Sequence, residues 1–279
     1  MASDFLDADA LCAVLEWVRE AGAMARGFRQ SGAYSVVEKG GGAGPVTEAD
    51  EAISAFLMQA LQGAFPKDTV VSEESPAATQ WQRRTWLIDP IDGTLDFVRG
   101  GEEFAVMVGL VVAGAPRFGV VYQPMLHRLY WGGAGLGAWC ATPSGTVALR
   151  VSTCADLSAA VMVKSRHHPS SAVDDLGAEL GIARVQEMGS MGLKVAAVAE
   201  GRADVYVNLS GKSSLWDVAG PQAILEAAGG RLSGLEAGTP AYVPAPLAIA
   251  HPVVASNGQV HDQVQRGVAR VFGRSGGLR

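Results

Sequence analysis

The chain has 279 residues, 48% of them apolar, which suffices for one large domain or for two closely packed halves. Its formal net charge is −6 and it has no basic run, which argues against binding to a nucleic-acid polymer. The three cysteines, Cys12, Cys140 and Cys154, form neither a C-x-x-C motif nor an even-numbered set, so a reducing compartment is expected.

The N-terminus has no feature of a targeting segment. It carries Asp4, Asp7, Asp9 and Glu16 where a signal peptide has a basic start and a continuous apolar core. The longest apolar run, residues 104–116, is shorter than the roughly 20 residues that span a bilayer. We therefore expect a soluble, cytoplasmic protein that does not bind a membrane. The oligomeric state stays open, a homodimer included.

The first elements along the chain are helical. Apolar residues recur at helical spacing over 11–18 and predict a helix that ends near 28–32. Residues 38–45 contain four glycines and a proline, which predicts an irregular, mobile loop. Thr47 and Asp50 then have the spacing of a capping box, so a second helix is expected to begin there.

Strand signals dominate residues 69–151, where β-branched and aromatic runs are separated by Gly, Pro and Ala turns. The expected strands cover 69–72, 85–89, 104–112, 117–122 and 128–131. Together they predict a mostly antiparallel meander that the two N-terminal helices cover.

The second half alternates between strands and helices, which predicts a layered α/β arrangement. The expected strands are 161–164, 203–207 and 253–255, and the expected helices are 174–180, 193–200, 217–228 and 259–271. A boundary near residue 150 is expected, with an N-terminal α+β half over 1–150 and a C-terminal α/β half over 151–279.

The strongest chemical signal follows the apolar strand that ends at residue 88. Asp89 and Asp92 fall in one tight turn, where two carboxylates can converge on a hard cation. Gly93 and Thr94 then offer backbone N–H groups that suit an anion at the start of a helix. Carboxylates beside an anion site imply a bridging metal ion, because like charges would otherwise repel. The pattern predicts Mg²⁺-dependent phosphate chemistry.

Three other acidic positions can join this turn, and each also has a structural explanation. Asp50 can simply cap its own helix, and the pair Glu73 and Glu74 can be a solvated turn. Asp217, at an expected helix N-terminus, can complement the helix dipole, which is worth about 0.3–1 kcal/mol. The Asp89 turn is harder to explain in this way, because an isolated charge after a buried strand is costly.

The acidic segments resemble the signature of the inositol monophosphatase superfamily. The matching segments are Asp-Pro-Ile-Asp-Gly-Thr at 89–94, Ser-Glu-Glu-Ser at 72–75, Trp-Asp-Val-Ala-Gly at 216–220 and Val-Thr-Glu-Ala-Asp at 46–50. They occur in the right order and spacing. The resemblance implies a mixed α/β fold, a five-layer αβαβα sandwich. It also implies lithium-sensitive, Mg²⁺-dependent hydrolysis of a phosphomonoester, with two to three Mg²⁺ ions per site.

The resemblance also implies a ligand set. Glu73, Asp89 and the carbonyl of Ile91 would bind a first metal ion. Asp89, Asp92 and Asp217 would bind a second ion, and Glu73 would also orient a third, weaker one.

The remaining roles concern water and phosphate. Thr94, together with Asp50, would position the attacking water, and the N–H groups of Gly93 and Thr94 would hold the phosphate. Glu74 would stand behind the ligands without touching the metal.

Two segments of the second half resemble bacterial phosphatases that act on 3′-phosphoadenosine 5′-phosphate. Residues 164–168 resemble their Ser-Arg-Ser-His segment, and residues 188–204 resemble their Gly-Ser-Ser-Leu-Lys…Ala-Glu-Gly stretch. Arg166, Lys194 and Lys212 would then contact a second phosphate. Arg166 and Lys194 can equally be solvated surface charges.

The favoured function is removal of the 3′-phosphate of 3′-phosphoadenosine 5′-phosphate, to give AMP and phosphate. The rival substrates are inositol monophosphate and other small sugar phosphates, fructose 1,6-bisphosphate included. A protein of another class, a non-catalytic sensor of phosphorylated ligands, is a further alternative. The intact carboxylate set argues against it, because a sensor needs no metal-activated water.

Overall fold

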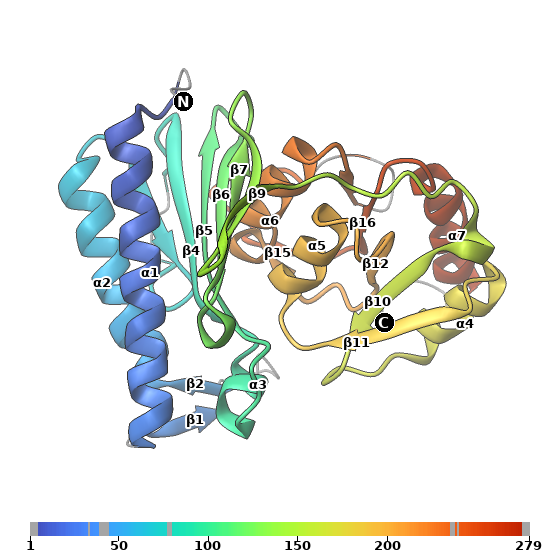
Figure 1. Ribbon diagram of the computed structural model, residues 1–279, viewed down its shortest axis with the longest axis horizontal. Coiled ribbons are helices and arrows are strands. Elements are labelled where there is room, and N and C mark those ends of the chain that lie inside the picture. Colours follow the sequence, from blue (N-terminus) through green and yellow to red (C-terminus); the bar gives the residue numbers. More distant parts are fainter. Residues whose placement is uncertain are drawn as a thin grey trace.

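The computed structural model describes residues 5–32, 34–38, 45–76, 80–234, 238 and 240–274. Its elements stack in five layers, helix–sheet–helix–sheet–helix, which Figure 1 shows from left to right. The predicted αβαβα sandwich is therefore confirmed. The predicted glycine-rich loop has its two ends in short strands, while its centre, residues 39–44, lies outside the described residues.

Two helices form the first layer, as predicted. Helix α1 ends at Gly32, whose φ of 61° is the left-handed conformation that glycine adopts at a helix C-terminus. Helix α2 begins with the predicted capping box between Thr47 and Asp50. A two-stranded ribbon precedes α2. These elements are α1 (Ala8–Ser31), β1 (Val36–Glu38), β2 (Pro45–Thr47) and α2 (Glu48–Ala64).

A seven-stranded sheet in sequential order β3 to β9 forms the second layer. Only β3 and β4 are parallel, so the predicted antiparallel meander is confirmed. The strands are β3 (Thr69–Ser72), β4 (Arg84–Asp92), β5 (Ala105–Val112), β6 (Ala115–Gln123), β7 (Arg128–Gly133), β8 (Gly137–Thr142) and β9 (Gly145–Ala148). The sequence reading missed β8 and β9, which are short and contain few β-branched residues. Helix α3 (Thr94–Arg99) and the turn η2 (Pro124–Leu126) interrupt this part of the chain.

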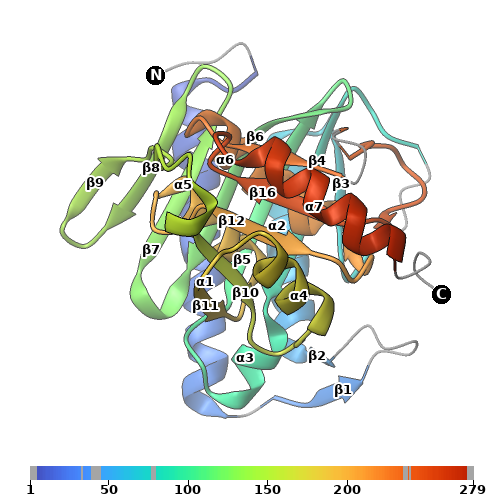
Figure 2. The same ribbon diagram turned by 90° about the vertical axis from the view of Figure 1, so that its right-hand side faces the viewer.

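A five-stranded sheet of order β11-β10-β12-β16-β14 forms the fourth layer. Helices α5 and α6 lie between the two sheets, while α4 and α7 cover the outer face of the smaller sheet (Figures 1 and 2). The strands are β10 (Val161–Ser165), β11 (Arg184–Met188), β12 (Val205–Asn208), β14 (Arg231–Ser233) and β16 (Val253–Ser256), and β13 (Ser213–Ser214) pairs with β15 (Ala248–Ile249). The helices are η3 (Leu157–Ala159), α4 (Ser171–Glu179), α5 (Met191–Ala199), α6 (Leu215–Ala227) and α7 (His261–Arg274).

The four helices and three strands predicted for this half are present, with shifted ends, and β11, β13, β14 and β15 were missed. The last strand of the large sheet ends at Ala148, and the first strand of the small sheet begins at Val161. One hydrophobic core nevertheless combines residues from both sheets with α5 and α6. The division into halves near residue 150 stays a prediction.

Three glycines bring α6 against the large sheet. A Cβ on Gly119 of β6 would lie 2.0 Å from the carbonyl oxygen of Gly220, and a Cβ on Gly109 of β5 would lie 2.6 Å from the backbone nitrogen of Gly220. Backbone-to-backbone contact this close excludes any side chain. This contact holds the N-terminal part of α6 against the large sheet. Asp217 lies in that part of the helix.

In the described part of the chain, no helix has both the length and the apolar composition to cross a bilayer.

Candidate active site

The prediction of a tight turn at Asp89 and Asp92 is wrong, because both residues lie within strand β4, which continues to Asp92. The strand aims both side chains toward the helices between the sheets. The pairing of β4 with β5 shifts register between Asp89 and Asp92, so β4 holds one extra residue there. Leu87 faces the core between the sheets, whereas Ile91 faces the core under α1 and α2. In a regular strand these two residues would face the same way. The bulge has therefore turned the chain over, which points Asp92 toward α5.

The carboxylate of Asp92 lies at the N-terminus of α5. The backbone N–H groups of Met191 and Gly192 donate to it at 3.1 and 2.6 Å, and the hydroxyl of Ser190 donates to it as well. A Cβ on Gly192 would lie 2.2 Å from Sδ of Met107, so any larger residue here would displace the Met107 side chain. A carboxylate has about four lone-pair directions, so these three donors leave about one for another partner.

The turn after Asp92 follows the predicted pattern. Gly93 has a φ of 90°, which favours glycine, and α3 begins directly after it. The hydroxyl of Thr94 donates to the carbonyl of Ile91 at 3.0 Å. A Cβ on Gly93 would lie 3.0 Å from the carbonyl oxygen of Glu103, so the turn packs against the loop after α3. The first turn of α3 thus lies beside the carboxylates.

Three further elements bring carboxylates to this place. Strand β3 runs parallel to β4, and the N–H of Glu73 donates to the carbonyl of Ile88 at 3.0 Å, directly before Asp89. Asp50 accepts hydrogen bonds from the N–H and hydroxyl of Thr47 at 2.8 and 2.6 Å. Asp217, in the first turn of α6, likewise closes the capping box of its own helix.

Burial and mutual repulsion raise the pKa values of these carboxyls. Burial, followed by the charge on Glu73, holds the pKa of Asp89 well above its ordinary value, and the pKa of Asp217 is raised for the same two reasons. Burial also raises the pKa of Asp50 to about 7, and the charges on Glu74 and Glu73 add to this rise. These shifts place Glu73, Asp92, Asp217 and Asp50 within electrostatic reach of Asp89, and a cation would offset the repulsion.

The donor set suits a hard cation such as Mg²⁺. All of its members are oxygens, and Oδ1 of Asp89 is buried without a hydrogen-bond partner. Within the described ranges, no group of three or more His, Cys, Asp or Glu side chains can hold a metal ion as it stands. The carboxylates are therefore neighbours that would have to converge further around an ion.

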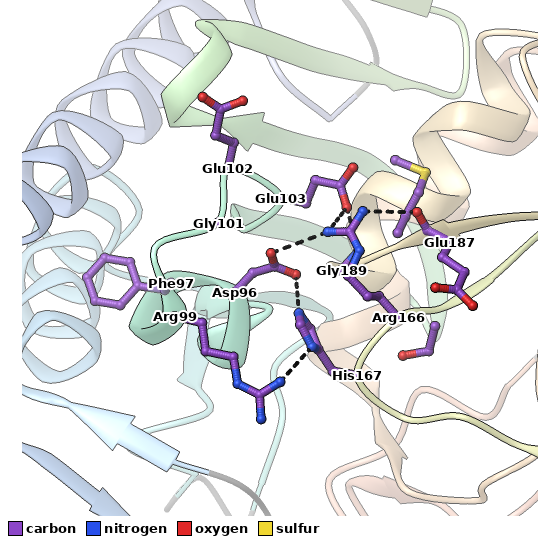
Figure 3. A network of polar contacts seen from close by, with 12 residues as sticks. Asp96, Phe97, Arg99, Gly101, Glu102, Glu103, Arg166, His167, Glu187 and Gly189 are labelled. Carbon is purple, nitrogen blue, oxygen red and sulfur yellow. Dashed lines mark hydrogen bonds and ion pairs between the residues drawn. The ribbon is translucent and has the colours of Figure 1, made fainter.

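Arg166, one of the predicted phosphate contacts, is already paired with carboxylates (Figure 3). Its Nη1 atom lies 2.8 Å from Oε2 of Glu103 and 3.5 Å from Oδ1 of Asp96, and its side chain is 39% exposed. The guanidinium is thus neither an isolated surface charge nor an unpaired cation. Its contact with a substrate stays a prediction.

The other two predicted cations differ from each other. Lys194 is 2% exposed, so its reading as a solvated surface charge is wrong. Its Nζ atom donates to the carbonyl of Gly189 at 2.6 Å and lies 5.4 Å from the ring centre of Tyr206. Burial lowers the pKa of Lys194 to about 8, although the charge on Asp92 opposes this shift. Lys212 is exposed on the loop before α6.

The sequence reading missed several groups that surround the site. Ser190 and Gly192 orient Asp92, and Asp96, Glu103 and His167 form the network around Arg166. A serine directly before an apolar run is a helix-cap signal, so Ser190 could have been recognised as a cap. Its bond to a carboxylate 98 residues away has no local signal.

Comparison with known proteins agrees with this fold. The model of the inositol monophosphatase family matches residues 7–271. The histidinol-phosphatase of Mycobacterium tuberculosis is 34% identical over 79% of this chain and 83% of its own length. The 3′(2′),5′-bisphosphate nucleotidase CysQ of Salmonella typhimurium is 35% identical over 72% of this chain and 80% of its own. The solved structure of Thermotoga maritima IMPase has a TM-score of 0.81 at 26% identity, covering 95% of this chain and 99% of that one.

The layered fold, the acidic site and these relatives define an enzyme of the phosphoric monoester hydrolase class, as the sequence predicted. The chain belongs to the inositol monophosphatase family, because the family model covers nearly its whole length.

Proposed function

We propose that this enzyme removes the 3′-phosphate of 3′-phosphoadenosine 5′-phosphate with Mg²⁺ as its cofactor. One observation carries the phosphatase part of the proposal. A cluster of neighbouring carboxylates surrounds Asp89, whose buried Oδ1 atom has no partner, directly before the Gly93–Thr94 turn. A cation would offset the repulsion within such an arrangement, and a cation beside the start of α3 would attract an anion.

In this proposal the carboxylates hold two to three Mg²⁺ ions. Glu73, Asp89 and the Ile91 carbonyl would hold the first ion, and Asp89, Asp92 and Asp217 the second, while Glu73 would also orient a third. When bound, Mg²⁺ would counter the charge of the phosphoryl oxygens and acidify the attacking water. The three hydrogen bonds at α5 fix the orientation of Asp92 in advance.

Other residues would orient water and phosphate. The Thr94 hydroxyl already donates its hydrogen to the Ile91 carbonyl, so its lone pairs remain to accept a hydrogen bond from water. With Asp50, it would position that water. The backbone N–H groups of Gly93 and Thr94 would hold the phosphate, and Glu74 would stand behind the ligands without touching the metal.

The choice of a bisphosphate substrate rests on a group of cations from the second half of the chain. Burial lowers the pKa of His168, and the charges on Lys194, His167 and Lys212 lower it further, as does that on Arg99 from the first half, so each of these groups lies within electrostatic reach of His168. A second phosphate would find cationic partners there. The relative CysQ is named as a 3′(2′),5′-bisphosphate nucleotidase.

A monophosphate is the second candidate substrate. The observation that favours it is the pairing of Arg166 with Asp96 and Glu103, which removes one cation from the proposed second-phosphate site. Relatives named histidinol-phosphatase and IMPase suggest histidinol phosphate and inositol phosphate. Fructose 1,6-bisphosphate, which carries two phosphates, stays a separate rival substrate.

A substrate panel tests both candidates. Phosphate release is measured from 3′-phosphoadenosine 5′-phosphate, inositol 1-phosphate, fructose 1,6-bisphosphate and histidinol phosphate, with Mg²⁺ or with a chelator. We expect the highest kcat/KM for the nucleotide, and release only with Mg²⁺. A higher kcat/KM for a monophosphate would replace the nucleotide assignment. An absence of Mg²⁺-dependent release from all four would favour a non-catalytic binding protein.

Lithium should inhibit at a fixed Mg²⁺ concentration. Li⁺ is small enough for an oxygen-lined cation site, but it carries half the charge of Mg²⁺ and would stabilise the leaving oxygen less. Sodium and potassium, at matched ionic strength, should inhibit less. Equal effects of all three salts would indicate simple screening of charges.

A cytoplasmic location and a homodimer stay proposals. The three cysteines are free, in accord with a reducing compartment. Cell fractionation would test the location, and light scattering of the purified protein would test the oligomeric state.

A further inference from the structure

A polar network beside the candidate active site joins α3 and the loop after it to the ends of β10 and β11 (Figure 3). Its centre consists of Asp96, Glu103, Arg166 and His167, which we call the Arg166 latch. Arg166 bridges Glu103 and Asp96, and Nε2 of His167 lies 2.7 Å from Oδ2 of Asp96. The proposed reaction gives no role to the two acidic residues or to the histidine.

The hydrogen bonds of His167 indicate how the charges are balanced. Arg99 donates to Nδ1 of His167 at 3.1 Å, so Nδ1 is the acceptor and the ring proton lies on Nε2, which donates to Asp96. Arg166 supplies a positive charge next to Asp96. The Asp96 side chain is 4% exposed, so its carboxylate depends on these partners.

Two glycines leave the space that the Asp96 carboxylate occupies. A Cβ on Gly101 would lie 2.0 Å from Oδ1 of Asp96, and a Cβ on Gly189 would lie 1.8 Å from Oδ2. Gly101 follows α3, whereas Gly189 follows β11. The carboxylate is thus enclosed between segments that are distant in the sequence, and this close fit leaves the latch little freedom.

The latch also holds the turn that precedes α5. Oε2 of Glu103 accepts a hydrogen bond from the N–H of Gly189 at 2.9 Å, and the carbonyl of Glu103 accepts one from the N–H of Ser190 at 3.0 Å. The backbone N–H of Arg166 donates to the carbonyl of Met188 at 3.0 Å. The next two N–H groups along the chain are those that orient the Asp92 carboxylate.

We propose that the Arg166 latch positions the candidate active site: by fixing the turn 188–190, it sets the first turn of α5 and so the orientation of Asp92. Arg166 and Glu103 are then positioning residues and not contacts to the substrate. The kinetic part of this inference rests on the proposed phosphatase function. A misplacement of about 1 Å in such a contact can lower turnover about 100-fold.

The test combines kinetics with amide hydrogen exchange in four variants. Glu103→Ala removes the acceptor for the Gly189 N–H, whereas Glu103→Gln keeps an acceptor but loses the charge. Arg166→Ala removes the bridge, and Arg270→Ala removes a surface arginine whose Nε lies 2.5 Å from Glu179, as a matched control. The substrates are 3′-phosphoadenosine 5′-phosphate and inositol 1-phosphate.

We expect Glu103→Ala and Arg166→Ala to lower kcat by about tenfold or more for every substrate that the wild-type enzyme hydrolyses, with KM changed less than about twofold. Amides 190–193 should exchange faster in both variants. Glu103→Gln should recover most of the kcat, and Arg270→Ala should match the wild type. Should Glu103→Ala not fold, Arg166→Ala and Glu103→Gln carry the test, because neither leaves the Gly189 N–H without an acceptor.

Two results would overturn the latch. One is a higher KM for the nucleotide alone in Arg166→Ala, which would identify Arg166 as a phosphate contact. The other is unchanged exchange at amides 190–193 in Arg166→Ala and in Glu103→Ala, or in Arg166→Ala alone if Glu103→Ala does not fold. If the wild-type enzyme hydrolyses neither substrate, the proposed function fails on its own, and the exchange measurement still decides the latch.

Discussion

The N–H of Gly192 donates a 2.6 Å hydrogen bond to the carboxylate of Asp92, although the two residues are 100 positions apart. The contact joins the end of β4 to the start of α5, and thus the large sheet to the helix layer beneath it. A carboxylate that the protein holds with three donors is preorganised, so its orientation does not have to be gained when a metal ion and substrate bind.

Asp92→Asn should lower kcat at least about 100-fold while the protein stays folded. The amide loses the charge proposed to bind Mg²⁺. If its oxygen accepts from Ser190 and Gly192, its NH₂ group faces the N–H of Met191, which is also a donor. Circular dichroism and kcat at saturating Mg²⁺ check this result. Asp175→Asn, on the exposed face of α4, is the matched control and should retain full activity. Near-normal kcat in folded Asp92→Asn would remove the ligand assignment.

Asp217→Asn should make the metal-free protein more stable at pH 7 by about 1 kcal/mol. Its pKa is raised by burial and by Glu73, so the folded protein holds the proton more tightly than the unfolded chain does. The Asp217 carboxyl therefore lowers the free energy of unfolding as pH rises above its ordinary pKa near 3.8. The gain should disappear below about pH 4, where both states are protonated. Urea unfolding at both pH values measures it.

Mg²⁺ should stabilise the wild-type protein more than the Asp217→Asn variant. Binding to the folded state alone adds about 2.7 kcal/mol at a free Mg²⁺ concentration about 100 times Kd. Thermal unfolding with increasing MgCl₂, against a choline chloride series of equal ionic strength, measures the difference. Equal shifts in the two proteins would show that Asp217 does not contribute to a Mg²⁺ site.

Gly119→Ala should destabilise the fold by about 3 kcal/mol. The new Cβ would lie 2.0 Å from the carbonyl oxygen of Gly220, so α6 and Asp217 must move away from the sheet. Activity should fall with stability. Gly27→Ala, in α1, adds a Cβ with nothing within 4 Å and should instead stabilise by about 0.5–1 kcal/mol. Urea unfolding compares the two, and equal effects would contradict the close-contact argument.

Because of His261, the free energy of unfolding should fall as pH is lowered from 6.5 to 4. Burial between Ser233 and Ser256 lowers its pKa to about 4, so the folded state holds the neutral ring. The stabilising effect is complete above pH 6.5 and is lost as pH falls through this window, by about 2 kcal/mol. His261→Gln should show a smaller loss over the same range, and His127→Gln, at an exposed position, should follow the wild type. Free energies of unfolding at both pH values decide.

The sequence by itself determined the local elements and the chemical character of the site. The capping box at Thr47 and Asp50, the apolar periodicity of α1 and the acidic end of β4 all depend on residues a few positions apart. Such signals act over one helical turn or one strand, so a single chain displays them fully. The short strands β8 and β14 were not predicted from the sequence, because they contain few β-branched residues.

Only the tertiary structure decided which distant groups meet. Asp92 pairs with α5, and carboxylates from distant segments surround Arg166, while Lys194 is buried. The segments that meet in this way share no local sequence pattern. Glycines leave room for such contacts, because a Cβ on Gly192 would collide with Sδ of Met107 and a Cβ on Gly189 with the carboxylate of Asp96. A sequence shows that a side chain is missing, but not which distant backbone fills the space, since that depends on how whole layers pack.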